Sequence, residues 1–185
     1  KTAGDEGKFE IAIHVAASEF YKEGKYQLHR ENKVLSSEEW IKLQEEWYSQ
    51  YPIFSVEDIF DQEDWNAWST FTQNNGKKYQ IVGDDLLTTN VKRIQKGIDE
   101  KAMNTVLIKL NQIGTVSQTL DAIRLTVDNG MNAIISHRGG ETNDDMIADL
   151  VIGTPATQCK FGGQDRGERL AKYNRLLHIE EILKS

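Results

Sequence analysis

The stretch TVLIKLNQ, residues 105–112, decides the fold class. Its run Thr105–Leu110 is short, continuous and apolar except for Lys109, and amides follow it. Such a run is typical of a strand buried on both faces, as in a parallel sheet. Five similar runs lie along the chain: Phe9–Val15, Pro52–Val56, Tyr79–Val82, Met131–Ile135 and Leu150–Ile152, the last extending toward Lys160.

Segments with helical periodicity separate these runs. Ser36 and Glu39 have the spacing of a capping box at the start of one helix, and Gly130 is placed to end another. Four further segments are expected to be helical: one capped by Asp61, one after Asn90, one from Thr142 through Leu150, and one over Gly167–Leu183. Alternating strands and helices predict an α/β protein built from right-handed βα units, in either an open sheet or a barrel.

Polar side chains stand where the predicted strands end. In chain order they are His14, Glu57-Asp58, Asp84-Asp85, Lys109, Ser136-His137-Arg138 and Lys160. In a (β/α) barrel the carboxyl ends of the strands converge on one mouth, so these residues would form one ionisable cluster. Glu57 and Asp84 offer the hard oxygen ligands that suit Mg²⁺. A lysine crowded by other cations can act as a base, and Arg138 offers a fork for phosphate or carboxylate.

Composition narrows the functional class. The formal charge is −7 and the pI about 5.2, and no basic stripe occurs, so we expect no nucleic-acid partner. Apolar stretches fall well short of the ~20 residues that span a bilayer, so we expect no membrane partner. The single cysteine, Cys159, fits a reducing compartment, and we expect a cytoplasmic protein. The chain starts at Lys1, which suggests a piece of a longer protein.

Seven stretches carry a resemblance to a known family. They are HVAASEF (14–20), SVEDIFDQEDW (55–65), QIVGDDL (80–86), LIKLNQIGT (107–115), SHRGGET (136–142), IADLVIG (147–153) and GERLAKYNRLLHIEEIL (167–183). Together they make the chain similar to enolase, the glycolytic phosphopyruvate hydratase. The resemblance implies a (β/α) TIM-type barrel of the enolase kind, of which residues 1–185 supply about six of eight strands. The amino-terminal domain and the first barrel strands would lie outside this chain.

The resemblance also implies roles for particular residues. Glu57 and Asp84 match two Mg²⁺ ligands of the family, and Lys109 matches the general base that removes the proton beside the substrate carboxylate. His137 and Arg138 match substrate contacts, Arg138 at the phosphate, and Lys160 matches the second active-site lysine. The implied reaction is the reversible dehydration of 2-phosphoglycerate, a phosphorylated three-carbon acid, to phosphoenolpyruvate. The implied assembly is a homodimer or something larger.

Four departures from the family pattern bear on activity. His14 replaces the aspartate that is the first Mg²⁺ ligand, Ile59 a proline, and Gly139 a serine that contacts phosphate, and the segment TPATQCKFGGQDRGER (154–169) differs although it keeps Lys160. Imidazole is a poor substitute for carboxylate around Mg²⁺. Losing one unit charge at close range costs on the order of 4 kcal/mol at an effective dielectric near 20, roughly a thousandfold in affinity. A softer ion, Zn²⁺ or Mn²⁺, could instead accept His14 with Glu57 and Asp84.

Two hypotheses follow. The chain belongs to an enolase-type lyase impaired by His14, or to a catalytically inactive pseudo-enolase that serves as a structural or binding subunit of a larger assembly. The residues Glu57, Asp84, Lys109, His137, Arg138 and Lys160 favour the first, and the departures favour the second. A different superfamily reaction, such as racemisation, is disfavoured because SHRGGE and NQIGT match enolase itself. In either case we expect this chain alone to be inactive.

Overall fold

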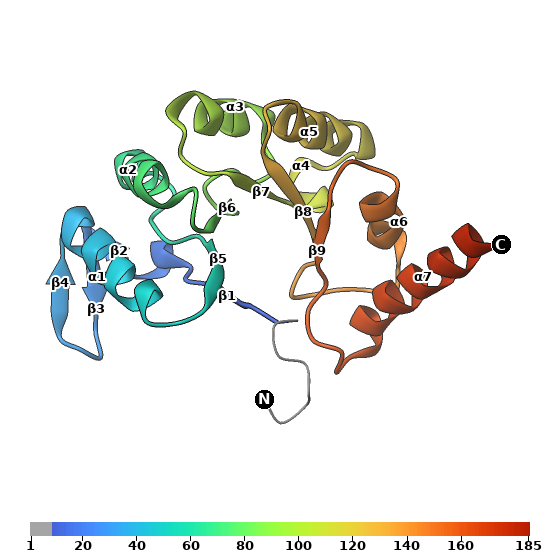
Figure 1. Ribbon diagram of the computed structural model, residues 1–185, viewed down its shortest axis with the longest axis horizontal. Helices are drawn as coiled ribbons and strands as arrows, with labels where there is room; N and C mark the ends of the chain where they lie inside the picture. Colours follow the sequence, from blue (N-terminus) through green and yellow to red (C-terminus); the bar gives the residue numbers. More distant parts are fainter. Residues whose placement is uncertain (1–8) are drawn as a thin grey trace. The chain divides into compact units, whose positions relative to one another are not determined.

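The computed structural model describes residues 9–185, which form two compact units. The first unit comprises the described residues up to Leu86 together with Lys96–Asn104. The second comprises Leu87–Gln95 together with Thr105–Ser185. Figure 1 labels the elements of both. Helix α3 (Val91–Glu100) contributes residues to each unit.

The first unit contains three parallel strands. They are β1 (Ile11–His14), β5 (Ile53–Glu57) and β6 (Gln80–Gly83), in the order β1-β5-β6. The register aligns His14 with Glu57, and Glu57 with Val82, so two of the strands end at polar residues side by side. Helices α1 (Ser37–Ser49) and α2 (Trp65–Asn75) and the 3₁₀ helix η1 (Ala17–Phe20) complete the βα units. The parallel strands and the helices α1 and α2 of this unit therefore lie where the sequence predicted them.

An antiparallel hairpin sheet was not predicted. It consists of β2 (Tyr21–Lys22), β3 (Lys25–Leu28) and β4 (Lys33–Leu35). Glu23 and Gly24 connect β2 to β3, and both have positive φ, 51° and 77°. Positive φ at both central residues is the condition for the tight hairpin turn that matches strand twist. Gly24 therefore indicates a turn in the sequence itself. The hairpin was still missed, because β2 is too short to show the alternating apolar pattern of a strand.

Aromatic side chains fill the core of the first unit. The rings of Tyr26 and Trp40 stack at a centroid distance of 5.6 Å, and Phe60 meets Trp68 and Phe71 edge to face at 5.8 and 5.7 Å. All five side chains are at most 2% exposed. Such aromatic pairs contribute about 0.5–1.5 kcal/mol each beyond the area they bury. This core supports the hairpin sheet and α2 and fixes the loop that follows β5.

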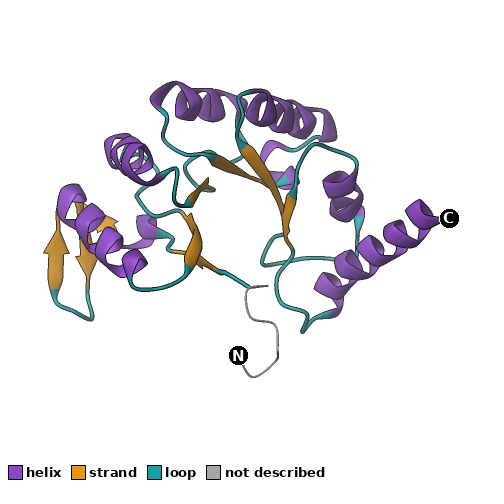
Figure 2. Cartoon of the chain, in the orientation of Figure 1, coloured by secondary structure: helices purple, strands orange, loops and turns teal. Residues whose placement is uncertain are grey.

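The second unit contains three parallel strands, β7 (Thr105–Ile108), β8 (Asn132–Ser136) and β9 (Gln158–Lys160). Their order is β7-β8-β9. Helices α4 (Leu110–Ile113), α5 (Val116–Asp128), α6 (Met146–Ile152) and α7 (Gly167–Lys184) belong to this unit. Figure 2 shows α5 and α6 on the outer side of its strands. Five of the six parallel strands lie where the sequence predicted them, and the sixth, β9, lies at Gln158–Lys160, toward which the last apolar run was expected to extend.

Three predicted element boundaries are wrong, one of them the start of the helix expected from Thr142, which begins at Met146 after the N-cap residue Asp145. Leu150–Ile152 was expected to be a strand extending toward Lys160, but these residues end α6, and the strand β9 begins only at Gln158. A short apolar run cannot be distinguished from a buried helical turn by periodicity alone. Asp61 was expected to cap α2, but the N-cap is Asp64, whose carboxylate accepts the N–H of Ala67. The capping box of Ser36 and Glu39 is confirmed.

Candidate functional site

The predicted metal ligands of the first unit lie together. His14 is the last residue of β1, Glu57 is the last of β5, and Asp84 directly follows β6. One possible ligand atom from each lies within 4.8 Å of the others. Adjacent parallel strands present their carboxyl ends at the same sheet edge, and the pairing of β1 with β5 and β5 with β6 produces this arrangement. The three residues that sequence reasoning grouped are therefore one cluster in space.

The environment of the cluster is asymmetric. Glu57 and Asp84 are buried, at 7% and 2% exposure, whereas the His14 side chain is 40% exposed. His14 Nδ1 lies 3.5 Å from Glu57 Oε1, and His14 Nε2 lies 3.6 Å from Asp58 Oδ2. The imidazole therefore sits between two carboxylates, and the cluster opens to solvent on the histidine side.

Asp58 organises the backbone beside this cluster. Its carboxylate accepts the N–H of Asp84 at 2.9 Å and the N–H of Asp85 at 3.1 Å. Its φ is 45°, in the left-handed region that aspartate tolerates better than most residues. Asp58 is 3% exposed, so both hydrogen bonds are shielded from water. Sequence reasoning missed this function because Asp58 appeared only as the partner of Glu57 in a Glu-Asp pair.

The donor set of this cluster does not fit Mg²⁺. Mg²⁺ requires oxygen ligands in near-ideal octahedral geometry. Here an imidazole occupies the position beside Glu57, with its Nδ1 3.5 Å from Oε1. No oxygen of His14 can take the place of the missing carboxylate. The donor set of His14, Glu57 and Asp84 is therefore a poor match for the predicted Mg²⁺ cofactor.

The predicted catalytic and substrate residues lie in the second unit. Lys109 follows β7, His137 and Arg138 follow β8, and Lys160 ends β9. The N–H of Lys109 donates to Thr89 Oγ1 at 2.9 Å, and Thr89 Oγ1 donates in turn to Gln112. These bonds fix the backbone from which the Lys109 side chain projects.

The loop after β8 is joined to both neighbouring strands. The N–H of His137 donates to the carbonyl of Lys160 at 2.9 Å. The Arg138 guanidinium donates through Nη1 to Asn111 Oδ1 at 2.9 Å, and Asn111 belongs to α4 directly after Lys109. The four predicted residues of this unit are thus held at the ends of three adjacent parallel strands. Two lysines, an arginine and an imidazole at one edge are suited to binding a small anion.

His137 is tightly enclosed. A Cβ on Gly162, whose φ is +79°, would lie 2.7 Å from His137 Cε1 and 2.8 Å from Arg169 Cδ. His137 Nδ1 is shielded from solvent and has no hydrogen-bond partner. Burial lowers the pKa of His137, and the nearby positive charge of Arg169 lowers it further. A neutral imidazole is therefore the stable form at neutral pH.

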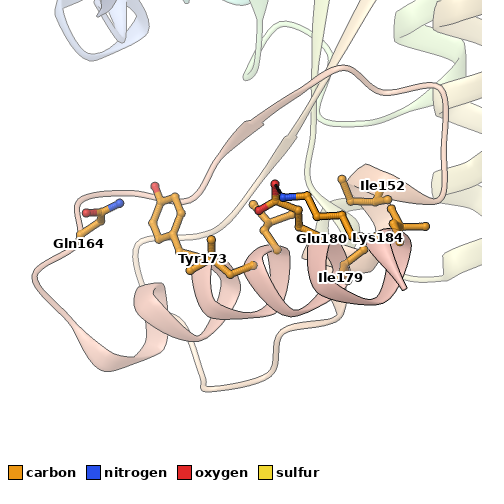
Figure 3. A pocket seen from close by; sticks show the side chains of 9 residues that line it. Ile152, Gln164, Tyr173, Ile179, Glu180 and Lys184 are labelled. Carbon is orange, nitrogen blue, oxygen red and sulfur yellow. Dashed lines mark hydrogen bonds and ion pairs between the residues drawn. The ribbon is translucent and has the colours of Figure 1, made fainter. Parts of the chain in front are cut away.

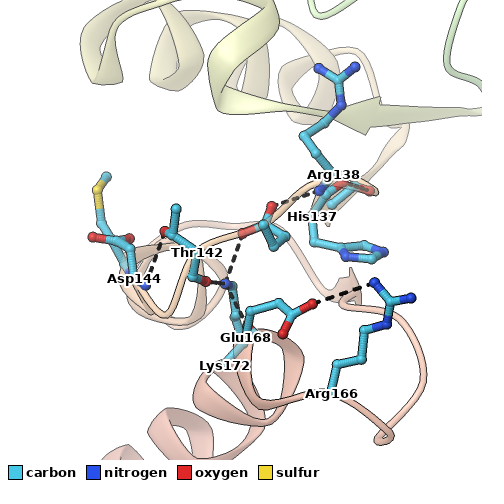
Figure 4. Close-up of polar contacts among 10 residues, drawn as sticks. His137, Arg138, Thr142, Asp144, Arg166, Glu168 and Lys172 are labelled. Carbon is cyan, nitrogen blue, oxygen red and sulfur yellow. Dashed lines mark hydrogen bonds and ion pairs between the residues drawn. The ribbon is translucent and has the colours of Figure 1, made fainter.

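A buried lysine fixes the loop that carries Arg138. Lys172 on α7 is 1% exposed and pairs with Glu141 Oε2 at 2.8 Å. It also donates to the carbonyls of Thr142 and Glu168 at 2.6 and 2.8 Å (Figure 4). Glu141 Oε1 accepts the N–H of Arg138 at 2.7 Å. Although burial raises the pKa of Glu141, the hydrogen bonds from Lys172 and Arg138 lower it overall. Sequence reasoning missed this pair, because an isolated helical lysine usually points to solvent.

An apolar groove of about 590 Å³ runs along α7 (Figure 3). Its lining includes Ile152, Tyr173 and Leu177. The two charged residues of the lining, Glu180 and Lys184, pair with each other at 2.5 Å. None of the predicted site residues contributes to this groove, which is distinct in character from the cationic edge of the same unit.

Parallel strands alternating with helices, with ionisable residues directly after the strand ends, define an α/β protein of the barrel class. The family model described as the enolase C-terminal TIM barrel domain matches residues 1–185. The chain therefore belongs to the enolase family, in its C-terminal TIM barrel domain. This confirms the predicted family and fold class. None of the helices in the described part of the chain has the length and apolar character needed to cross a bilayer.

Proposed function

We propose that this chain carries the base and the anion-binding groups of an enolase-type lyase, which interconverts 2-phosphoglycerate and phosphoenolpyruvate. The observation that carries the proposal is the edge of the second unit, where Lys109, Arg138 and Lys160 follow three adjacent parallel strands. Membership of the enolase family supports assigning these residues to that reaction.

In the proposed reaction, Lys109, Lys160 and Arg138 each have one role. The Lys109 amine takes the proton from the carbon beside the substrate carboxylate. The electron pair of that C–H bond forms the new C=C bond, and the hydroxyl on the next carbon leaves as water after taking up a proton from a general acid, which the family resemblance places outside these residues. Lys160 offsets the negative charge that builds up at the carboxylate. Arg138, oriented by Asn111, binds the phosphate as a guanidinium fork.

His137 would bind substrate as a neutral donor or acceptor. Burial and the charge of Arg169 lower its pKa, so it adds no charge at neutral pH. The backbone N–H of His137 donates to the carbonyl of Lys160, which ties the loop after β8 to the end of β9. Because the ligand set of the first unit does not fit Mg²⁺, we expect turnover with Mg²⁺ to be poor.

A second candidate function is a non-catalytic one. The presence of His14 in the metal cluster favours a pseudo-enolase that acts as a structural or binding subunit of a larger assembly. A homodimer and a cytoplasmic location remain predictions of the resemblance and the composition.

One assay distinguishes the two candidates. Full-length protein is incubated with 2-phosphoglycerate and Mg²⁺, Mn²⁺ or Zn²⁺ in turn, and phosphoenolpyruvate is followed by ³¹P NMR. The lyase proposal expects turnover with at least one ion, its loss in Lys109→Ala, and its retention in Lys92→Ala, a matched change at an exposed lysine of α3. Turnover that survives Lys109→Ala would show that Lys109 is not the base. No turnover with any of the three ions would favour the pseudo-enolase.

A further inference from the structure

We infer that His14, Glu57 and Asp84 form a site for a first-row transition-metal dication of the zinc type instead of Mg²⁺. The inference rests on the proposed function only for what the ion would do in catalysis. Whether the ion binds depends on the cluster alone, so the two can fail independently.

The donor set selects the ion. The cluster offers one imidazole nitrogen and two carboxylates, with one possible ligand atom of each within 4.8 Å of the others. Imidazole suits zinc, copper, nickel and iron, whereas an all-oxygen set suits magnesium and calcium. Zinc accepts histidine nitrogen and carboxylate oxygen together, and a site with three protein ligands keeps a position open. The 40% exposure of His14 leaves such a position on the solvent side.

The spacing of one ligand pair, His14 and Glu57, agrees with a small tetrahedral ion. Two ligands about 2.1 Å from a shared ion lie about 3.4 Å apart at a tetrahedral angle. At the right angle of an octahedral Mg²⁺ site they lie about 3.0 Å apart. The distance from His14 Nδ1 to Glu57 Oε1 is 3.5 Å. This pair is therefore close to a tetrahedral chelate without further movement.

The strands hold this spacing. The N–H of Val15, next to His14, donates to the carbonyl of Glu57 at 2.9 Å. The N–H of Asp58, next to Glu57, donates to the carbonyl of Val82 at 3.1 Å. The ends of β1, β5 and β6 are thus tied together just where the ligands begin. Rigid supports of this kind set ligand geometry more narrowly than loops do.

Asp58 completes the site as a positioning residue. Ligating histidines commonly direct their second ring nitrogen at a carboxylate, which fixes the ring orientation and raises its basicity. Asp58 Oδ2 lies 3.6 Å from His14 Nε2, on the side of the ring away from Glu57. Both Asp58 oxygens also accept backbone N–H groups, from Asp84 and Asp85. Asp58 therefore holds the backbone of Asp84 in place and lies beside the second ring nitrogen of His14.

A competing set of ligands exists beside this one. Asp58, Asp84 and Asp85 also bring one oxygen each within 4.8 Å of one another. This all-carboxylate set would suit Mg²⁺ or Ca²⁺. Each Asp58 oxygen already accepts a backbone N–H, at 2.9 and 3.1 Å, and so has one lone pair left for an ion, whereas the set with His14 needs no oxygen from Asp58. We therefore assign the ion to the set that contains His14.

Calorimetric titration of the full-length protein with Zn²⁺ and with Mg²⁺ tests the inference. We expect wild type to bind Zn²⁺ at least a hundredfold more tightly than Mg²⁺. His14→Ala should lose this Zn²⁺ affinity by at least a hundredfold, and His14→Asp should gain Mg²⁺ affinity. His29→Ala, a matched change at an exposed histidine of the first unit, should bind Zn²⁺ as wild type does. Circular dichroism confirms that each variant is folded.

Two results would overturn the inference. One is tighter binding of Mg²⁺ than of Zn²⁺ by wild type. The other is loss of Zn²⁺ binding in Asp85→Asn with retention in His14→Ala, which would assign the ion to the carboxylate set. A shift of the His14 ring ¹⁵N signals on Zn²⁺ addition gives a readout that does not depend on turnover. Zn²⁺ binding through His14 without lyase activity would contradict the proposed function but would support the inferred metal site.

Discussion

Gly139 follows Arg138 in the loop after β8, and the space around its α-carbon is open. A Cβ built there would meet nothing within 4 Å, and the same holds for Gly140. The family resemblance places a phosphate-contacting serine at Gly139. The structure therefore has room for the group that the sequence has lost.

This predicts the outcome of Gly139→Ser. The free energy of unfolding should change by no more than about 0.5 kcal/mol, because the new side chain meets no neighbour. Affinity for inorganic phosphate should rise several-fold, because a hydroxyl donor is added beside Arg138. Denaturant unfolding and a phosphate titration measure the two effects. Gly140→Ser is the matched control, with the same stability and no gain in affinity; equal gains in both variants would contradict the prediction.

His137 predicts a dependence of stability on pH. Burial and Arg169 lower its pKa below the ordinary value of 6.5, so the unfolded chain binds the proton more readily than the folded chain. Stability is therefore lost as the pH falls through about 6.5 toward the lower folded value. The carboxylates titrate below this window, which leaves the imidazole effect visible.

Chemical denaturation of wild type and His137→Gln at a series of pH values measures this effect. The free energy of unfolding of wild type should fall more steeply between about pH 7 and pH 5.5 than that of the variant. His178→Gln, at an exposed histidine on α7, should keep the wild-type slope. Parallel curves for wild type and His137→Gln would show that His137 titrates alike in both states.

At the scale of elements, α7 is connected to the loop after β8 by one buried lysine. Lys172 reaches Glu141 and the carbonyls of Thr142 and Glu168. Removing one partner of a buried ion pair leaves the other charged and unsatisfied, which typically costs 3–5 kcal/mol. The helix therefore contributes to the position of Arg138 through Glu141 as well as to the core.

Lys172→Met should reduce the free energy of unfolding by about 3 kcal/mol, the low end of the range for buried pairs, because the Glu141 side chain is 16% exposed. Adding Glu141→Gln should recover part of that loss, because the amide removes the buried charge while its oxygen still accepts the Arg138 N–H. Denaturant unfolding of both single variants and the double variant gives the coupling energy. Strict additivity would show that Lys172 and Glu141 act independently.

The helices and strands differ in how far the sequence predicts them. The α1 cap was predictable because Ser36 and Glu39 satisfy each other's backbone groups within one turn. The helical state of Leu150–Ile152 was not, because burial of Ala148, Leu150 and Val151 depends on contacts from outside the segment. The short strands of the hairpin sheet also depend on their packing against the aromatic core, which local pattern does not reveal.

At the scale of the whole molecule, ion binding should appear as thermal stability. An ion that binds only the folded state at about a hundred times its Kd adds about 2.7 kcal/mol. For a chain of this size that corresponds to a rise in Tm of roughly 5 to 10 °C. Calorimetric scans with Zn²⁺ should show this rise in wild type and not in His14→Ala. An equal rise in both would place the Zn²⁺ elsewhere, and a larger rise with Mg²⁺ in wild type would contradict the zinc-type assignment.

The residues of the candidate site could be predicted from the sequence, but the contacts that position them could not. Sequence pattern placed Glu57, Asp84 and Lys109 after strand ends, and pairing of adjacent strands then brought His14, Glu57 and Asp84 together. It could not reveal that Asp58 holds Asp84, or that Lys172 holds the Arg138 loop. Both functions arise from side chains that meet residues far away in the chain.

The sequence by itself determined the family, the alternation of parallel strands with helices, and the chemistry of each strand end. It also determined that an imidazole replaces a carboxylate at His14, because side-chain identity is a property of a single position. Only the tertiary structure decided that His14 Nδ1 lies 3.5 Å from Glu57, with Asp58 on the other side of the ring. Such distances depend on strand register and on the backbone turn after β5, and metal selectivity depends on them.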